Sequence, residues 1–91
     1  MLIVASYDIP DDRRRLRVAN ALEDFGERVQ YSVFECHLEN EQLDRLRLRL
    51  LQELDEGVDS VRIYRVCGTC EEALETLGTA EPTNDPKVYV L

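Results

Sequence analysis

The chain has 91 residues and a formal net charge of −8, with 44% hydrophobic and 33% charged residues. This length allows one small domain, and the composition is typical of a folded chain rather than a disordered one. The negative charge argues against broad, sequence-independent binding to nucleic acid, which requires a basic surface.

No targeting or membrane segment is expected. The apolar stretch at residues 2–5 is short and follows no basic leader, and no segment has the length of a membrane span. The three cysteines cannot all pair within one chain. We therefore expect a cytoplasmic protein with reduced thiols.

The first predicted elements are a strand and a helix. Residues 2–7 are apolar and partly β-branched, which is typical of a buried strand. Pro10 and the two aspartates after it mark a helix start, and the pattern of residues 12–25 is helical. Gly26 is expected to end this helix in the left-handed conformation.

The middle of the chain predicts further strands around a second helix. Residues 28–38 form either one long strand or two short strands joined by a turn at residues 31–32, and the sequence leaves this open. Asn40 is expected to cap a helix that runs to about Glu56, with Gly57 as its stop. Residues 58–66 predict the next strand, and residues 71–77 a short helix.

The order of elements predicts an α+β fold. If residues 28–38 hold two strands, the chain is a ferredoxin-like βαββαβ sandwich. We expect a single domain over residues 1–91, with a core at 1–78 and a polar loop and tail strand at 79–91. A short apolar strand behind a polar loop is suited to pairing with a sheet edge, which favours a homodimer with that strand exchanged or docked at the interface.

Asp8 is the first candidate site residue. It lies at the end of the first predicted strand, where Asp11 and Asp12 are better placed to cap the following helix. One carboxylate is a poor metal site, but two copies across a dimer axis would suit Mg²⁺, which keeps several waters. Such a metal activates water or stabilises a phosphate leaving group.

Four arginines follow Asp8 within the predicted first helix. Residues 8–17 hold four bases and three acids, whereas residues 70–91 hold five acids and one base, so any phosphate contact must be local. Positive charge near a helix N-terminus opposes the dipole, which indicates a use such as phosphate binding. The competing interpretation is ion pairing with Asp11, Asp12 or Glu27 on a solvated helix face.

Cys67 and Cys70 have the CxxC spacing. A zinc site completed by Cys36 and His37 and a redox pair are two interpretations of this spacing. Neighbouring strand residues point to opposite faces, so Cys36 and His37 would not readily share one metal. We expect instead that both CxxC cysteines pack as ordinary small apolar residues.

Three segments together resemble the CRISPR-associated protein 2 family. They are YDIPDDRRRLRVA at residues 7–19, GERVQYSVFEC at residues 26–36 and DSVRIY at residues 59–64. The resemblance extends over nearly the whole chain. It implies a ferredoxin-like homodimer with two short strands in residues 28–38 and a tail strand that docks on the partner subunit's sheet.

The resemblance also implies a site and partners. Asp8 would lie near its symmetry mate as the catalytic ligand of Mg²⁺, or of Mn²⁺. The residues implied to line the nucleic-acid site are Tyr7, Arg15, Arg17, Arg28 and Phe34. Some members are metal-dependent endonucleases that cleave single-stranded RNA or double-stranded DNA. Others bridge subunits of the CRISPR integrase, CRISPR-associated protein 1, and support spacer acquisition without catalysis.

We therefore expect a CRISPR adaptation protein that supports spacer acquisition, either with metal-dependent endonuclease activity at Asp8 or as a non-catalytic adaptor. Two alternatives remain open from the sequence. One is a toxin-type messenger-RNA endoribonuclease on the same fold, and the other is a ferredoxin-like regulatory dimer that binds a small ligand and needs no basic first helix. For Tyr7 and Phe34, packing in the core competes with stacking on bases.

Overall fold

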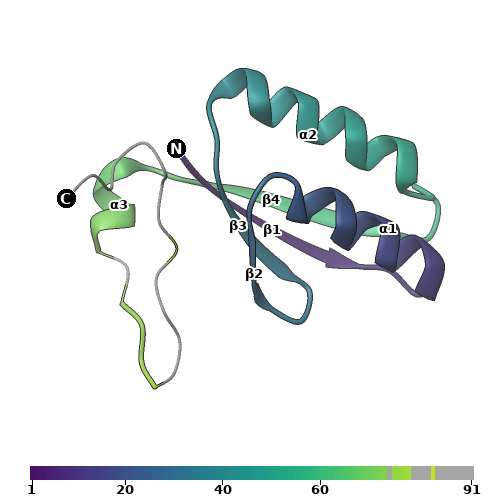
Figure 1. The fold of residues 1–91 in the computed structure, drawn as a ribbon, viewed down its shortest axis with the longest axis horizontal. Helices are drawn as coiled ribbons and strands as arrows, with labels where there is room; N and C mark the ends of the chain where they lie inside the picture. Colours follow the sequence, from purple (N-terminus) through teal and green to yellow (C-terminus); the bar gives the residue numbers. More distant parts are fainter. Residues whose placement is uncertain (74, 79–82, 84–91) are drawn as a thin grey trace.

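The computed structural model describes residues 1–73, 75–78 and 83. Within these residues, four strands and three helices follow one another, and Figure 1 shows their arrangement. In chain order they are β1 (Leu2–Asp8), α1 (Asp12–Glu23), β2 (Glu27–Gln30), β3 (Val33–His37), α2 (Asn40–Glu53), β4 (Ser60–Val66) and α3 (Gly68–Glu72).

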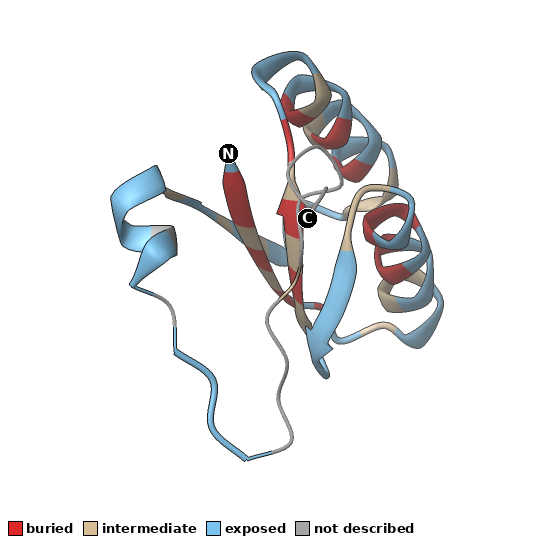
Figure 2. Ribbon diagram, turned by 60° about the vertical axis from the view of Figure 1, so that its left-hand side comes forward, coloured by how far each residue is buried: buried red, intermediate tan, exposed pale blue. Residues whose placement is uncertain are grey.

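The strands form one antiparallel sheet in the order β2-β3-β1-β4. β1 lies between β3 and β4, so the strand that carries Asp8 is central, and Asp8 itself pairs with Ser60. Helices α1 and α2 lie on one face of this sheet (Figure 2). This arrangement confirms the ferredoxin-like βαββαβ prediction, including two strands in residues 28–38. The predicted tail strand lies outside the described residues.

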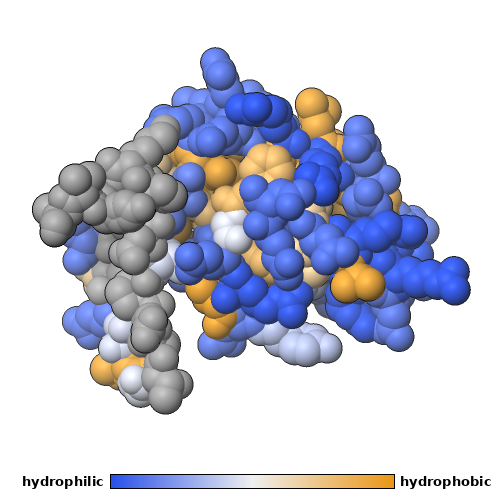
Figure 3. Space-filling model, viewed as in Figure 1, coloured by the Kyte–Doolittle hydropathy of each residue, from blue (hydrophilic) through white to orange (hydrophobic). Residues whose placement is uncertain are grey.

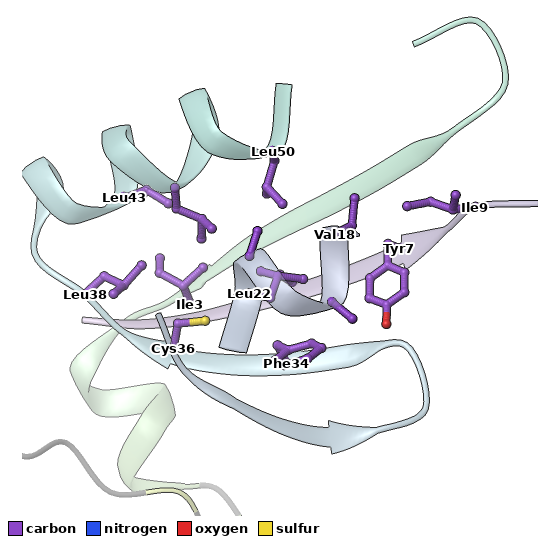
Figure 4. Packing of buried hydrophobic residues seen from close by; sticks show 14 residues of the cluster. Ile3, Tyr7, Ile9, Val18, Leu22, Phe34, Cys36, Leu38, Leu43 and Leu50 are labelled. Atoms are coloured by element: carbon purple, nitrogen blue, oxygen red, sulfur yellow. The ribbon is translucent and has the colours of Figure 1, made fainter. Parts of the chain in front are cut away.

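The core lies between the sheet and the two long helices. Side chains alternate along a strand, and in β1 Ile3, Ala5 and Tyr7 are buried on the helix-covered face. Phe34 and Cys36 of β3 extend this layer (Figure 4). The helices contribute apolar residues at three- and four-residue spacing, as expected for one buried stripe each: Val18, Ala19, Ala21 and Leu22 from α1, and Leu43, Leu46 and Leu50 from α2.

The start of α1 agrees with the sequence, but the predicted reason for Gly26 is wrong. Asp11 caps the helix, and its Oδ2 accepts a hydrogen bond from the Arg14 backbone N–H at 2.9 Å. Gly26 does not have a positive φ. A side chain there would overlap the Glu35 carbonyl oxygen and the Cys36 sulfur, so close approach to β3 is what requires glycine.

The second helix differs from the prediction at both ends. Its N-cap is Glu39 rather than Asn40, and the Glu39 backbone N–H donates to Gln42 Oε1 at 2.8 Å. The helix ends at Glu53 rather than Glu56. Gly57 is therefore not its stop, and lies in a turn where its N–H donates to Asp55 Oδ1 at 3.0 Å.

The third helix lies earlier than the predicted 71–77. It starts directly after Cys67, whose sulfur accepts the Cys70 backbone N–H at 3.2 Å. This bond satisfies one of the N–H groups that a helix start leaves without an intrahelical partner. Within the predicted loop at 79–86, Thr83 is described, and its hydroxyl donates to Glu35 Oε1 at 2.7 Å.

Candidate functional site

Asp8 is an exposed carboxylate at the end of β1. It shares the parity of Val4 and Ser6, so it lies on the sheet face that α1 and α2 leave open (Figure 2). Asp11 caps α1, which confirms that Asp8 is not needed for that role. Within the described part of the chain, no hydrogen bond or ion pair holds the Asp8 side chain. Its carboxylate is therefore available to a ligand.

A hollow of about 300 Å³ lies beside Asp8 at this end of the sheet. It is lined by Ser6, Tyr7, Asp8, Ser60, Arg62 and Tyr64. Arg62 pairs in register with Ser6, one strand away from Asp8 and two positions along. A hydrogen bond with Tyr64 raises the pKa of Arg62. The guanidinium of Arg62 and the carboxylate of Asp8 line the same hollow.

Arg62 is a site residue that was not predicted from the sequence. The signal was present, because Ser60, Arg62 and Tyr64 alternate with the apolar Val61 and Ile63, which pack against the core. The alternation does not tell which strand pairs with β4. It therefore could not predict that Arg62 lines the same hollow as Asp8. That proximity depends on the pairing of β4 with β1.

The donor set at Asp8 fits a hard divalent cation that keeps much of its water shell. Among the described residues, no three His, Cys, Asp or Glu side chains lie together as a metal cage. Mg²⁺ does not need such a cage, because it is commonly bound by one or two carboxylates with waters and substrate phosphates as the other ligands. One Asp8 from each of two chains would supply that number.

A second hollow, of about 320 Å³, lies on the other side of β1. Its lining includes three of the predicted nucleic-acid residues, Tyr7, Arg15 and Arg28, together with Asp12 and a tyrosine not predicted from the sequence, Tyr31. Tyr31 is 79% exposed at the turn between β2 and β3. A hollow with two arginines and an exposed aromatic ring has the groups that phosphates and bases bind.

Several of the arginines of α1 are engaged in ion pairs. Arg15 contacts Asp12 and donates to the Ile9 carbonyl at 2.8 Å. Arg17 Nε lies 3.2 Å from Glu53 Oε2 and connects α1 to the end of α2. The pairing of Arg15 with Asp12 follows the competing interpretation of the cluster, whereas the Glu53 contact was not expected.

Tyr7 and Phe34 lie in the core. Phe34 is fully buried and Tyr7 nearly so, with their ring centroids 6.4 Å apart. The Tyr7 hydroxyl donates to the Tyr31 carbonyl at 3.4 Å. The Arg28 guanidinium lies 5.3 Å from the centre of the Phe34 ring. The buried Phe34 ring thus makes a cation–π contact with the exposed Arg28 guanidinium.

The prediction that Cys67 and Cys70 pack as small apolar residues is wrong, because both are exposed. Cys36 is buried in the core, and His37, its neighbour on β3, is partly exposed on the opposite face of the sheet. The described residues contain no cluster of three metal-binding side chains that includes them. A zinc site built from Cys36, His37 and the CxxC pair therefore has no support.

Comparison with known proteins identifies the family of this chain. The profile described as CRISPR associated protein Cas2 matches residues 1–73. The chain belongs to the Cas2 family. The CRISPR-associated endonuclease Cas2 2 of Thermus thermophilus is 53% identical over 70 residues, which cover 77% of this chain and 78% of that protein. The CRISPR-associated endoribonuclease Cas2 1 of Chloroflexus aurantiacus is 42% identical over the full length of both chains.

Solved structures share the fold of this chain. A hypothetical protein from Thermus thermophilus has a TM-score of 0.79 and 46% identity, over 91% of this chain and 96% of that one. A chain from a partial Cas6-RT-Cas1–Cas2 complex has a TM-score of 0.71, covering 89% of this chain and 93% of its own, and its 22% identity shows the fold alone. The matching profile and the curated relatives confirm the predicted family. No helix in the described part of the chain is long and apolar enough to cross a membrane.

Proposed function

We propose that this Cas2 chain is a homodimeric CRISPR adaptation protein of the cytoplasm with a metal-dependent phosphodiesterase site at Asp8. The observation that carries the proposal is the position of Asp8. It is an exposed carboxylate without a capping role, on an open sheet face, beside a hollow that also contains Arg62. The names of the relatives, an endonuclease and an endoribonuclease, support phosphodiester chemistry.

A second copy of the chain is the proposed cover for the open sheet face. Val4, Tyr64 and Val66 lie on this face, and Tyr64 is 49% exposed. Half-exposed apolar and aromatic side chains on a sheet face are suited to an isologous contact, in which each residue is used twice. Asp8 has the same parity as Val4, so two facing sheets would bring two Asp8 carboxylates toward one axis.

In such a dimer the two Asp8 side chains would hold Mg²⁺, or Mn²⁺. A bound divalent cation lowers the pKa of a water ligand and neutralises charge on a phosphate. Arg62 is placed to donate charge-assisted hydrogen bonds to a phosphate that enters the hollow beside Asp8. The chain would thus provide a carboxylate and a guanidinium on one surface.

We assign to the second hollow the binding of nucleic acid at a distance from the phosphate that is cleaved. Arg28 offers a guanidinium group for a phosphate, and the exposed Tyr31 ring offers a surface on which a base can stack. Arg15 would bind a phosphate in place of its contact with Asp12. Phe34 acts here by holding Arg28. Arg17, engaged with Glu53, would join only after that ion pair opens.

A CRISPR integrase subunit, CRISPR-associated protein 1, is the proposed protein partner. The support is the Cas2 family itself and the likeness of fold to a chain solved in a complex named for Cas6-RT, Cas1 and Cas2. In this role the dimer bridges integrase subunits during spacer acquisition. Cleavage requires the Asp8 carboxylate, whereas bridging does not. A substitution of Asp8 therefore distinguishes the two roles.

The test is Asp8→Asn, with Asp44→Asn as the matched control. Asp44 is an exposed aspartate on α2 that pairs with Arg47, away from both hollows. Each purified variant is assayed for cleavage of single-stranded RNA and double-stranded DNA with Mg²⁺ or Mn²⁺. The same variants are assayed for spacer integration together with the integrase subunit. We expect Asp8→Asn to abolish cleavage and Asp44→Asn to leave it unchanged.

The outcomes distinguish the two roles. Loss of cleavage with integration retained means that the chain is an adaptor whose Asp8 site is separate from its bridging role. Unchanged cleavage in Asp8→Asn would remove Asp8 from the mechanism. Sedimentation of the wild-type chain as a monomer, with or without divalent cation, would overturn the shared site.

A further inference from the structure

The exposed CxxC pair has no part in the proposed function. Cys67 follows the last residue of β4, and Cys70 lies in the first turn of α3. Their sulfur atoms are 2.9 Å apart, and the Cys70 backbone N–H donates to Cys67 Sγ at 3.2 Å. A disulfide bond is about 2.0 Å long, so about 0.9 Å of further approach would bring these atoms to bonding distance.

We propose that Cys67 and Cys70 are a reactive dithiol that closes reversibly to an intramolecular disulfide, by exchange with a small organic disulfide such as oxidised glutathione. The Cys67 thiolate attacks one sulfur of the oxidant, forms a mixed disulfide and releases one thiolate. The Cys70 thiolate then attacks Cys67 Sγ and releases the second. Two electrons pass from the cysteines to the oxidant, and the two cysteine protons are taken up by the released thiolates.

The local environment sets the order of attack. A hydrogen bond from the Cys70 side chain, joined by backbone N–H groups, lowers the pKa of the Cys67 thiol. The same contact raises the pKa of the Cys70 thiol. The thiolate is the nucleophile in disulfide exchange, so Cys67 reacts first and Cys70 resolves the mixed disulfide.

The third cysteine provides an internal reference. Cys36 is buried in the core, and burial raises its pKa to about 11. A thiol that is both buried and protonated reacts slowly. Every fast thiol reaction of the folded chain is therefore assigned to the CxxC pair.

The dithiol lies at the opposite end of β4 from the proposed catalytic site. Val66 at the end of β4 pairs with Leu2, whereas Ser60 at its start pairs with Asp8. A disulfide bond would constrain the backbone between Cys67 and Cys70, directly after β4, and would not involve the residues that line the Asp8 hollow. The proposal is thus independent of the proposed function and can fail or hold by itself.

The test uses the full chain, freshly reduced, and titrates it with mixtures of reduced and oxidised glutathione. Acid quenching, alkylation and intact mass followed by peptide mapping identify each product. The oxidised wild-type chain is expected to carry no alkyl group and no glutathione at Cys67 and Cys70, and to be alkylated at both again after treatment with excess reduced glutathione. Cys70→Ser is expected to accumulate one glutathione adduct at Cys67, and Cys67→Ser to form its adduct more slowly.

Other products would overturn the proposal. Stable glutathione adducts on the wild-type chain would mean that Cys70 does not resolve them. Disulfide-linked dimers as the main product would mean that each thiol prefers another chain. Zinc that copurifies with the wild-type chain, is lost from Cys67→Ser and prevents exchange would mean that the thiols ligate a metal shared between molecules.

Discussion

Arg14 and Asp59 form a bidentate ion pair between the first turn of α1 and the residue before β4. Arg14 Nε donates to Asp59 Oδ2 at 2.7 Å, and Nη2 donates to Oδ1 at 3.1 Å. The Asp59 side chain is inaccessible to solvent, and its Oδ2 also accepts the Asp55 backbone N–H at 2.9 Å. One carboxylate therefore orders the turn after α2 and fixes the start of α1 beside the strand end that carries Asp8.

Arg14→Gln is expected to lower the stability of the fold. The substitution leaves the buried Asp59 carboxylate without its guanidinium, and an unpaired buried charge is costly. Arg13→Gln is the control, because Arg13 is an exposed neighbour that makes no ion pair within the described part of the chain. Urea unfolding of the two variants at neutral pH checks this. Equal midpoints would show that the Arg14–Asp59 pair adds nothing beyond surface charge.

The same pair predicts a loss of stability in acid. The hydrogen bond from Arg14 holds the pKa of Asp59 below its ordinary value of about 3.9. Because the pKa is lower in the folded state, this stabilisation is complete above the unfolded-state pKa. It is lost as the pH falls through the lower folded-state value. The wild-type urea midpoint should therefore begin to drop as the pH falls below about 4, the ordinary pKa of an aspartate.

Arg14→Gln should flatten that drop without removing it. The pKa of Asp11 is also lowered, chiefly by the Arg14 backbone N–H, and this bond survives the substitution. Urea midpoints measured across the acid range for both proteins give the two slopes. A variant slope as steep as the wild-type slope would assign the acid dependence to carboxylates other than Asp59.

The sequence predicted the local features of the fold better than the contacts between distant segments. The Asp11 cap and the apolar stripe of α1 depend on neighbours within a few residues, and both were predictable. The Arg14–Asp59 pair joins residues 45 positions apart, and the Asp59 carboxylate also accepts the Asp55 backbone N–H in the turn after α2. Nothing local distinguishes Asp59 from the exposed acids near it.

In the candidate site, too, local features were predictable and contacts between distant residues were not. Asp8 could be selected from the sequence because it ends an apolar strand and has no capping role. Its proximity to Arg62 follows from strand pairing, and the burial of Phe34 follows from which face of β3 meets the helices. The second ligand proposed for the metal belongs to another molecule, and no pattern within one chain gives its distance.

Gly26→Ala is expected to destabilise the fold by about 1–3 kcal/mol, the usual cost of overpacking. The added methyl group would overlap the Glu35 backbone carbonyl and the Cys36 sulfur, and the backbone oxygen cannot rotate away. Gly57→Ala is the control, because its Cβ would lie 3.4 Å from Asp55 Oδ1, an ordinary contact. Thermal unfolding compares the two variants. A stability for Gly26→Ala equal to that of Gly57→Ala would mean that α1 and β3 separate at no cost.

Arg62→Gln is expected to lower the rate of phosphodiester cleavage by about 10–100-fold, the range of one charge-assisted hydrogen bond of about 1.5–3 kcal/mol. Arg65→Gln is the matched control on the same strand, because an odd separation places Arg65 on the other face of β4. The cleavage rate of each variant is measured over a range of Mg²⁺ or Mn²⁺ concentrations. Equal rates for Arg62→Gln and Arg65→Gln would exclude Arg62 from the site.

Arg28→Ala is expected to weaken binding to single-stranded RNA and to change its salt dependence. Each phosphate contact that is lost lowers the slope of log affinity against log salt by about 0.7 for a single strand. Arg45→Ala removes the same charge from an exposed position on α2, so it tests whether net charge alone explains the effect. Titrations of a labelled oligonucleotide over a range of salt concentrations give both slopes. The chain carries a net charge of −8, so a uniform electrostatic effect would lower the affinity of the two variants equally. Equal affinities would exclude the hollow lined by Arg15 and Arg28 as the nucleic-acid binding site.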